Sequence, residues 1–154
     1  MLQTVKDIFD IAIWIIDSQN ESNGNTRTAD TKEYELRTPG LLNSLLDECY
    51  PYSDTYVDNH DGKRPVCRKI TSFEDSVDLD EFICTAVLPY GLASLLVQQE
   101  LPDVANTCLQ LYQERLNKAR MTRPATESFE SVEDVYSCGG YGGGIEYGRF
   151  GRWP

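Results

Sequence analysis

The chain has 154 residues, enough for one domain that buries a core of its own without stapling by disulfides or metals. Its formal net charge is −11, from 25 acidic and 14 basic residues, and so acidic a surface repels phosphate, which argues against specific binding of DNA or RNA. The cysteines are odd in number and widely spaced, which predicts free thiols in a reducing compartment at Cys49, Cys67, Cys84, Cys108 and Cys138.

The N-terminal segment predicts an amphipathic helix from Thr4 to about Gln19, because Asp7 completes a capping box with Thr4. Its main apolar face is formed by Val5, Ile8, Ala12, Ile15 and Ile16, and extra width comes from Phe9, Ile13 and Trp14. This width suggests burial on more than one side, including against a neighbouring subunit. Acidic residues interrupt the apolar run, and no stretch of about twenty apolar residues occurs, so we expect neither a signal peptide nor a membrane span.

Residues 20–30 are polar and turn-rich, and a second helix is predicted over residues 31–49. Pro39 and Gly40 in its middle predict a kink or a split into two helices. Its apolar face is formed by Tyr34, Leu41, Leu42, Leu45, Leu46 and Cys49.

Residues 55–72 form the least helical part of the chain, and their pattern of short apolar runs around a turn favours a short β-hairpin. The segment also holds a small basic cluster, formed by Lys63, Arg64, Arg68 and Lys69. We interpret this cluster as a solvated loop and not as an anion site.

A third helix is predicted from Asp78, with Glu81 as its capping partner, to residue 99, with a bend at Pro89. This helix is apolar nearly all round, which places it at the centre of the fold. A fourth helix is predicted from Pro102 to residue 123. Its apolar stripe is formed by Ala105, Cys108, Leu109, Tyr112, Leu116 and Ala119. We therefore expect a mainly α, four-helix bundle-like domain over residues 1–123.

Residues 124–138 are acidic and are predicted to link this domain to a C-terminal arm, residues 139–154, which reads GGYGGGIEYGRFGRWP. Seven of the eleven glycines lie in the arm, and its other side chains are types that concentrate binding energy at interfaces. We expect an extended arm that docks on another chain; the alternative is a terminus with incidental aromatics. The candidate docking residues are Tyr141, Ile145, Tyr147, Arg149, Phe150, Arg152 and Trp153.

No motif for catalysis, a cofactor or a metal fits the chain. A phosphate-binding loop ending in Gly62 and Lys63 would need a glycine where Val57 stands, and one histidine with scattered cysteines does not make a zinc site. His60 could partner a cysteine in nucleophilic catalysis, but a solvated turn histidine is the favoured interpretation. The acidic run 74–81 is interpreted as the opening of a helix rather than as a pair of catalytic carboxylates. We expect no cofactor, no metal and no enzymatic activity.

Three stretches resemble the head-to-tail adaptor (connector) proteins of tailed bacteriophages. They read RTPGLLNSLLDECYPY at 37–52, DEFICTAVLPYGLA at 80–93 and CLQLYQERL at 108–116, within a resemblance that spans roughly residues 1–120. The last two carry most of it, with a small-residue turn at Leu92 and Ala93 and the pattern Leu-x-x-Tyr-Gln-Glu-Arg-Leu.

The resemblance implies a small helical virion protein without enzymatic activity, made in the host cytoplasm and located at the head–tail junction. Its implied partners are the portal protein, the next head–tail joining or tail protein, and its own copies in a ring that is commonly twelve-fold. C-terminal segments in this family often contact the portal, and an acidic ring suits DNA that slides through it. Two alternatives stay open: a non-enzymatic cytoplasmic helical binding module that acts through its C-terminal arm, and an enzyme that depends on Cys67 or His60.

Overall fold

The computed structural model describes residues 3–17, 24–29, 31–57, 62–63 and 66–122. The α-helices in this part of the chain are α1 (Val5–Ile15), α2 (Lys32–Cys49), α3 (Leu88–Val97) and α4 (Pro102–Thr122). Shorter elements are the strands β1 (Gln3–Thr4) and β2 (Ser76–Val77), a 3₁₀ turn η1 (Tyr50–Tyr52) and a π turn η2 (Ile83–Val87). The predicted mainly α fold is confirmed.

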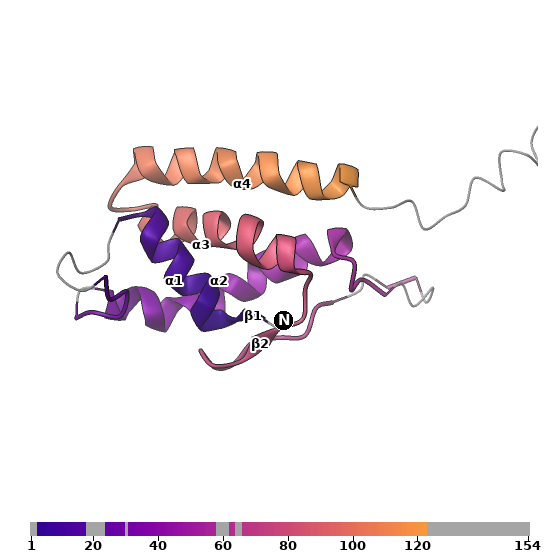
Figure 1. The fold of residues 1–154 in the computed structure, drawn as a ribbon, viewed down its shortest axis with the longest axis horizontal. Helices are drawn as coiled ribbons and strands as arrows, with labels where there is room; N and C mark the ends of the chain where they lie inside the picture. The colour runs from indigo at the N-terminus through magenta and orange to yellow at the C-terminus, as the bar shows by residue number, and fades with distance from the viewer. Residues whose placement is uncertain (1–2, 18–23, 30, 58–61, 64–65, 123–154) are drawn as a thin grey trace, which may run out of the picture. The chain divides into compact units, whose positions relative to one another are not determined.

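Helix α3 lies at the centre of the domain. It packs against α1, α2 and α4, and Figure 1 shows it between α4 on one side and α1 and α2 on the other. Leu88, Leu92 and Leu96, which follow one another at helical spacing, are at most 2% exposed. The central position predicted from the apolar residues all round this helix is therefore confirmed.

The start of α1 is fixed by the predicted capping box. The Asp7 backbone N–H donates to the Thr4 hydroxyl at 3.2 Å, and the Thr4 backbone N–H donates to the Asp7 carboxylate at 2.9 Å. The Thr4 hydroxyl also donates to this carboxylate at 2.7 Å, and this bond, together with that from the Thr4 N–H, holds the pKa of Asp7 below its usual value. The helix ends at Ile15, earlier than the predicted Gln19, and Asp17 has a left-handed backbone with φ of 55°.

The extra width of the α1 apolar surface has two different outcomes. Phe9 and Ile13 are both fully buried inside this domain, so most of the width serves the protein's own core. Trp14 is 55% exposed and stays outside that core.

The two-stranded sheet does not lie where the hairpin was predicted. The described residues of segment 55–72 contain no strand; instead β1 pairs antiparallel with β2, with Gln3 opposite Val77. The physical reason lies in Asn43, whose side chain accepts from the Ile70 N–H at 2.8 Å and donates to the Ile70 carbonyl at 2.9 Å. A side chain on α2 thus takes the place of a neighbouring strand.

Helix α2 runs unbroken from Lys32 to Cys49, so of the two outcomes predicted at Pro39 and Gly40 the split is wrong, whereas the kink stays a prediction. A proline removes only one backbone donor, and both halves of the helix are held against the core, by buried Tyr34 before the proline and by buried Leu42 and Leu46 after it. The tertiary packing of the helix outweighs this local defect.

The third helical segment starts from a different cap than predicted. Asp80, and not Asp78, accepts the Ile83 backbone N–H through its carboxylate at 3.0 Å. The backbone carbonyl of Asp78 instead accepts from the Thr55 hydroxyl at 2.9 Å. A bend was predicted at Pro89. The helix departs from α geometry one turn earlier, in the π turn η2, where the wider hydrogen-bonded turn of the backbone leaves room for the proline that follows.

Helix α4 begins at Pro102 as predicted and ends at Thr122. Its buried face is formed by Ala105, Cys108, Tyr112 and Ala119, with Leu116 partly buried. The assignment of Leu109 to this face is wrong, because its side chain is 41% exposed. Its position around the helix places Leu109 at the edge of the buried stripe, where a small rotation of the helix decides whether a side chain lies in the core or in solvent.

Candidate interaction surfaces

The predicted docking arm lies outside the described residues. This holds for all seven candidates, Tyr141, Ile145, Tyr147, Arg149, Phe150, Arg152 and Trp153. It also holds for His60, Arg64 and Cys138. Their roles therefore stay predictions.

The two stretches that carry most of the resemblance meet in the contact between α3 and α4. A Cβ atom at Gly91 would lie 2.9 Å from Cδ2 of Tyr112 and 3.1 Å from Cδ2 of Leu45. Only glycine allows the two helices so close an approach at this point. Tyr112 was predicted from the sequence as part of the apolar stripe of its helix, whereas Gly91 was not predicted as a contact residue.

The ring of Tyr112 is held in place by its hydroxyl. That group donates to the Glu48 carboxylate at 2.8 Å and lies 3.5 Å from Sγ of Cys49. Tyr112 is 3% exposed, and this burial, together with its two neighbours, raises the pKa of its hydroxyl. The phenol therefore stays protonated and acts as a fixed hydrogen-bond donor between α4 and α2.

Arg115 joins α4 to the π turn. Its guanidinium donates to the Ala86 carbonyl at 3.2 Å and to the Tyr90 hydroxyl at 3.3 Å, and lies 4.2 Å from the centroid of the Tyr90 ring. A π turn followed by a proline leaves helix carbonyls without their usual N–H partner. Arg115 adds a donor from α4 at the end of this turn, a role that sequence reasoning missed.

Replacing Arg115 by alanine should lower the free energy of unfolding by about 1–2 kcal/mol, through loss of the cation–π contact and of two hydrogen bonds. Urea unfolding followed by circular dichroism measures this change. The matched control is Lys118→Ala, at an exposed position of the same helix, which should stay within about 0.5 kcal/mol of the parent. Equal effects at both positions would contradict the role given to Arg115.

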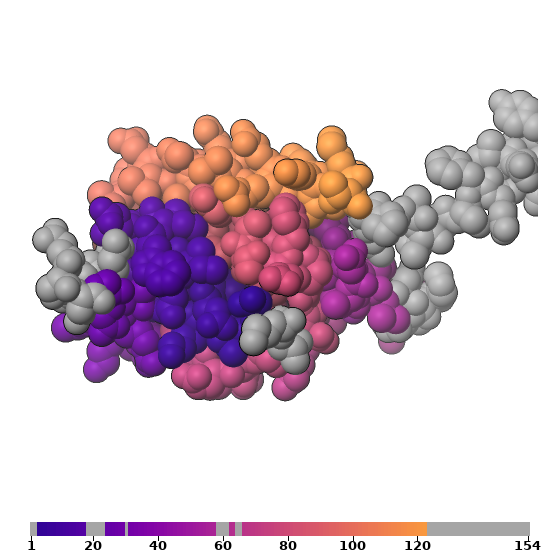
Figure 2. All heavy atoms as spheres, in the orientation of Figure 1, coloured from indigo at the N-terminus to yellow at the C-terminus, as the bar shows by residue number. Residues whose placement is uncertain are grey.

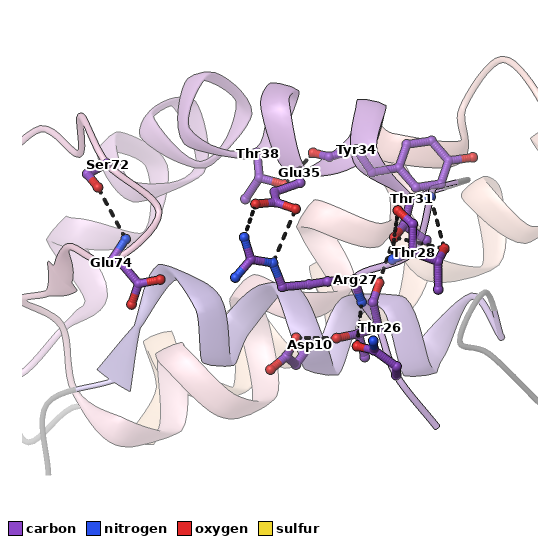
Figure 3. A network of polar contacts seen from close by, with 11 residues as sticks. Asp10, Thr26, Arg27, Thr28, Thr31, Tyr34, Glu35, Thr38, Ser72 and Glu74 are labelled. Atoms are coloured by element: carbon purple, nitrogen blue, oxygen red, sulfur yellow. Dashed lines mark hydrogen bonds and ion pairs between the residues drawn. The ribbon is translucent and has the colours of Figure 1, made fainter. Parts of the chain in front are cut away.

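A polar network fixes the loop segment 24–29, between α1 and α2 (Figure 3). The Thr26 hydroxyl donates to the Asp10 carboxylate at 2.6 Å, and Arg27 forms an ion pair with Glu35 while lying 5.1 Å from the centroid of the Phe73 ring. The loop is thereby tied to α1, to α2 and to the turn before β2. These contacts hold structure together and form no reactive site.

Carboxylates of the acidic run 74–81 accept hydrogen bonds from backbone N–H groups. The Asp75 carboxylate accepts from the Thr71 and Ser72 N–H groups at 2.9 and 2.8 Å, and these bonds lower its pKa. Asp80 caps the third helical segment, in line with the interpretation of this run as a helix opening. Among the basic cluster, Lys63, Arg68 and Lys69 are exposed.

The four described cysteines, Cys49, Cys67, Cys84 and Cys108, are free and buried. Burial raises the pKa of Cys49 and of Cys84 to about 12 and raises that of Cys67 as well. A nucleophilic cysteine needs a lowered pKa, so the environment of Cys67 counts against the enzyme alternative. Within the described residues, no group of three His, Cys, Asp or Glu side chains could hold a metal ion.

All five cysteines should be free thiols, since their number is odd and the described ones form no bridge. Titration of the denatured, unreduced protein with a thiol reagent should therefore count five reactive groups. In the native protein the four buried thiols should react more slowly, because solvent and reagent do not reach them. A count of three or of one would reveal a disulfide.

No protein-family model, curated protein or solved structure matches this chain. A function must therefore be proposed from its own residues. Among the described residues, every helix is too short or too polar to cross a bilayer.

Proposed function

We propose that the protein is a head-to-tail adaptor of a tailed bacteriophage. In this function its copies form a ring, commonly twelve-fold, that joins the capsid portal to the next head–tail joining or tail protein. The ring provides the passage for DNA and sits at the head–tail junction of the virion. The chain acts through surfaces and carries out no reaction.

The observation that supports this function most is the contact between residues 80–93 and 108–116. These stretches carry most of the resemblance, and they pack on each other through Gly91 with Tyr112 and Ala86 with Arg115. The two similar stretches therefore pack on each other around the contact of α3 with α4, which supports the proposal.

The charge of the chain gives a second argument. Each copy carries a formal net charge of −11, so a ring of copies is strongly acidic. DNA that passes through such a ring meets repulsion rather than binding, which keeps it free to slide. An acidic adaptor of this kind needs no sequence-specific contact with the DNA.

The C-terminal arm supplies the contact with the portal in this proposal. Ordering a chain costs roughly 1–2 kcal/mol per residue, and each buried aromatic side chain returns at most about 1.5–3 kcal/mol. The apolar anchors of residues 139–154 alone do not clearly offset the cost of that whole segment. Backbone pairing with the portal, as an added strand, would contribute the rest.

Deletion of the gene tests the function directly. Particles made without the protein should package DNA and then lose it, because the portal stays unsealed and no tail attaches. Electron microscopy and an infectivity assay measure this outcome. Normal tailed, infectious particles from the deletion would refute the proposal.

Truncation after Ser137 tests the arm separately from the fold. The shortened protein should keep its melting temperature, since the described core ends at Thr122, and should no longer attach to purified portals. Binding to portals with unchanged affinity would show that the arm is a passive terminus. Light scattering of the protein mixed with purified portals tests the ring, because many copies on one portal are expected of an adaptor and not of a cytoplasmic binding module.

A further inference from the structure

One stripe on the outer side of α4 carries no formal charge. It is formed by Asn106, Leu109, Gln110, Gln113 and Asn117, which follow one another at spacings of three and four residues. All five side chains are exposed, and Figure 2 shows α4, in orange, along the edge of the molecule. We call these five residues the amide stripe.

The amide stripe has no partner within the part of the chain that the structure describes. None of its four carboxamides takes part in a hydrogen bond or ion pair there. A helix face in water usually carries charges, and the exposed face of α2 does so with Lys32, Glu33 and Asp47. In a chain with a net charge of −11, an uncharged face of this length points to a contact.

The four carboxamides follow one another in a symmetrical order along α4: Asn, Gln, Gln, Asn. Asn106 and Asn117 lie outside, and Gln110 and Gln113 lie inside, symmetrically about the point between residues 111 and 112. If two such helices pack antiparallel about a two-fold axis through that point, each Asn106 lies level with Asn117 of the other copy. Each Gln110 then lies level with Gln113. A carboxamide both donates and accepts hydrogen bonds, so each level brings together complementary groups.

The charges beyond the stripe fit the same arrangement. Asp103 lies three residues before Asn106, and Arg120 lies three residues after Asn117. In the antiparallel pair, Asp103 of each copy therefore lies level with Arg120 of the other. Both residues are exposed, and neither forms an ion pair within the described residues. Opposite charges would thus meet at both ends of the contact.

We propose that the amide stripe is the contact face of a homodimer in which two copies of α4 pack antiparallel about a two-fold axis. A face that binds a basic protein would carry carboxylates, and a face that binds nucleic acid would carry cations. The amide stripe carries neither, and an uncharged face lets two acidic copies approach each other with the least repulsion. Leu109, in the middle of α4, adds apolar area. The dimer is independent of the proposed function, because neighbours in a ring contact each other through two different faces.

Analytical ultracentrifugation of the full chain tests the proposal. The parent should sediment as a dimer, at twice the 17.5 kDa of one chain. The double variant Gln110→Glu with Gln113→Glu places carboxylates level with carboxylates, and it should raise the dimer dissociation constant at least about tenfold. Glutamine and glutamate have similar size and helix propensity, so the helical circular dichroism should not change.

Two further variants make the result specific. Gln110→Glu with Gln113→Lys should keep the dimer, because only an antiparallel pair sets each new glutamate level with a lysine of the other copy. Gln98→Glu with Gln99→Glu adds the same charge at exposed positions off the stripe and should also keep the dimer. A monomeric parent, dissociation by the Gln98 and Gln99 changes, or loss of the dimer in the glutamate–lysine variant would overturn the proposal. None of these outcomes bears on the particle made without the protein, which tests the proposed function.

Discussion

Replacing Leu92 by alanine should lower the free energy of unfolding by about 2–5 kcal/mol, the range for a leucine removed from a close-packed core. Leu92 is 0% exposed and lies on α3, which packs against the three other helices. The change removes buried apolar surface and leaves a cavity that this rigid surrounding only partly fills. Urea unfolding followed by circular dichroism measures the loss.

Two other leucines make the measurement specific. Leu36 is 76% exposed, so the same substitution there should change stability by no more than about 0.5 kcal/mol. Leu95 is only partly buried, so the loss of stability on its replacement by alanine should fall between those at Leu36 and Leu92. A loss below about 0.5 kcal/mol at Leu92 would mean that α3 is not the centre of the core.

Features with a short-range cause could be predicted from the sequence. The capping box of Thr4 and Asp7 depends only on two residues three positions apart. Proline is favoured in the first turn of a helix whatever the surrounding structure, so Pro102 marked the start of α4. The central place of α3 followed from its composition, because a helix that is apolar all round must be covered on all sides.

Features that depend on distant residues could not be predicted. The pairing of Gln3 with Val77 joins residues 74 positions apart in the sequence over a strand of two residues, too short for any periodic signal. The backbone of Ile70 is satisfied by the Asn43 side chain, which removes the need for a hairpin. Both are outcomes of tertiary packing, which overrides local propensity.

The candidate surfaces were predictable only in part. Trp14 and Leu109 stand beside apolar stripes, and periodicity does not decide on which side of the boundary such residues fall. The amide stripe was readable in the sequence as a polar pattern at helical spacing. A search for apolar periodicity passes over it, because the pattern gains meaning only once α4 is known to expose that side.

Alanine in place of Gly91 should destabilise the protein, whereas alanine in place of Gly40 should stabilise it. Both glycines lie inside helices, where alanine is favoured by about 0.5–1 kcal/mol because it loses less backbone freedom on folding. A Cβ at Gly40 meets nothing within 4 Å, but at Gly91 it would lie 2.9 Å from the Tyr112 ring. Overpacking of this kind costs about 1–3 kcal/mol, enough to reverse the gain.

The difference between the two alanine variants isolates the contact between α3 and α4, because the gain in helix propensity is common to both. The Tyr112 ring has little freedom to give way, since its hydroxyl is held by Glu48 and the neighbouring Leu45 closes the other side. Unfolding free energies from urea titration should therefore place the Gly91 variant below the Gly40 variant by about 1–3 kcal/mol. If the two variants prove equally stable, the ring moves aside at little cost, and the close approach at Gly91 does not fix how α4 sits on α3.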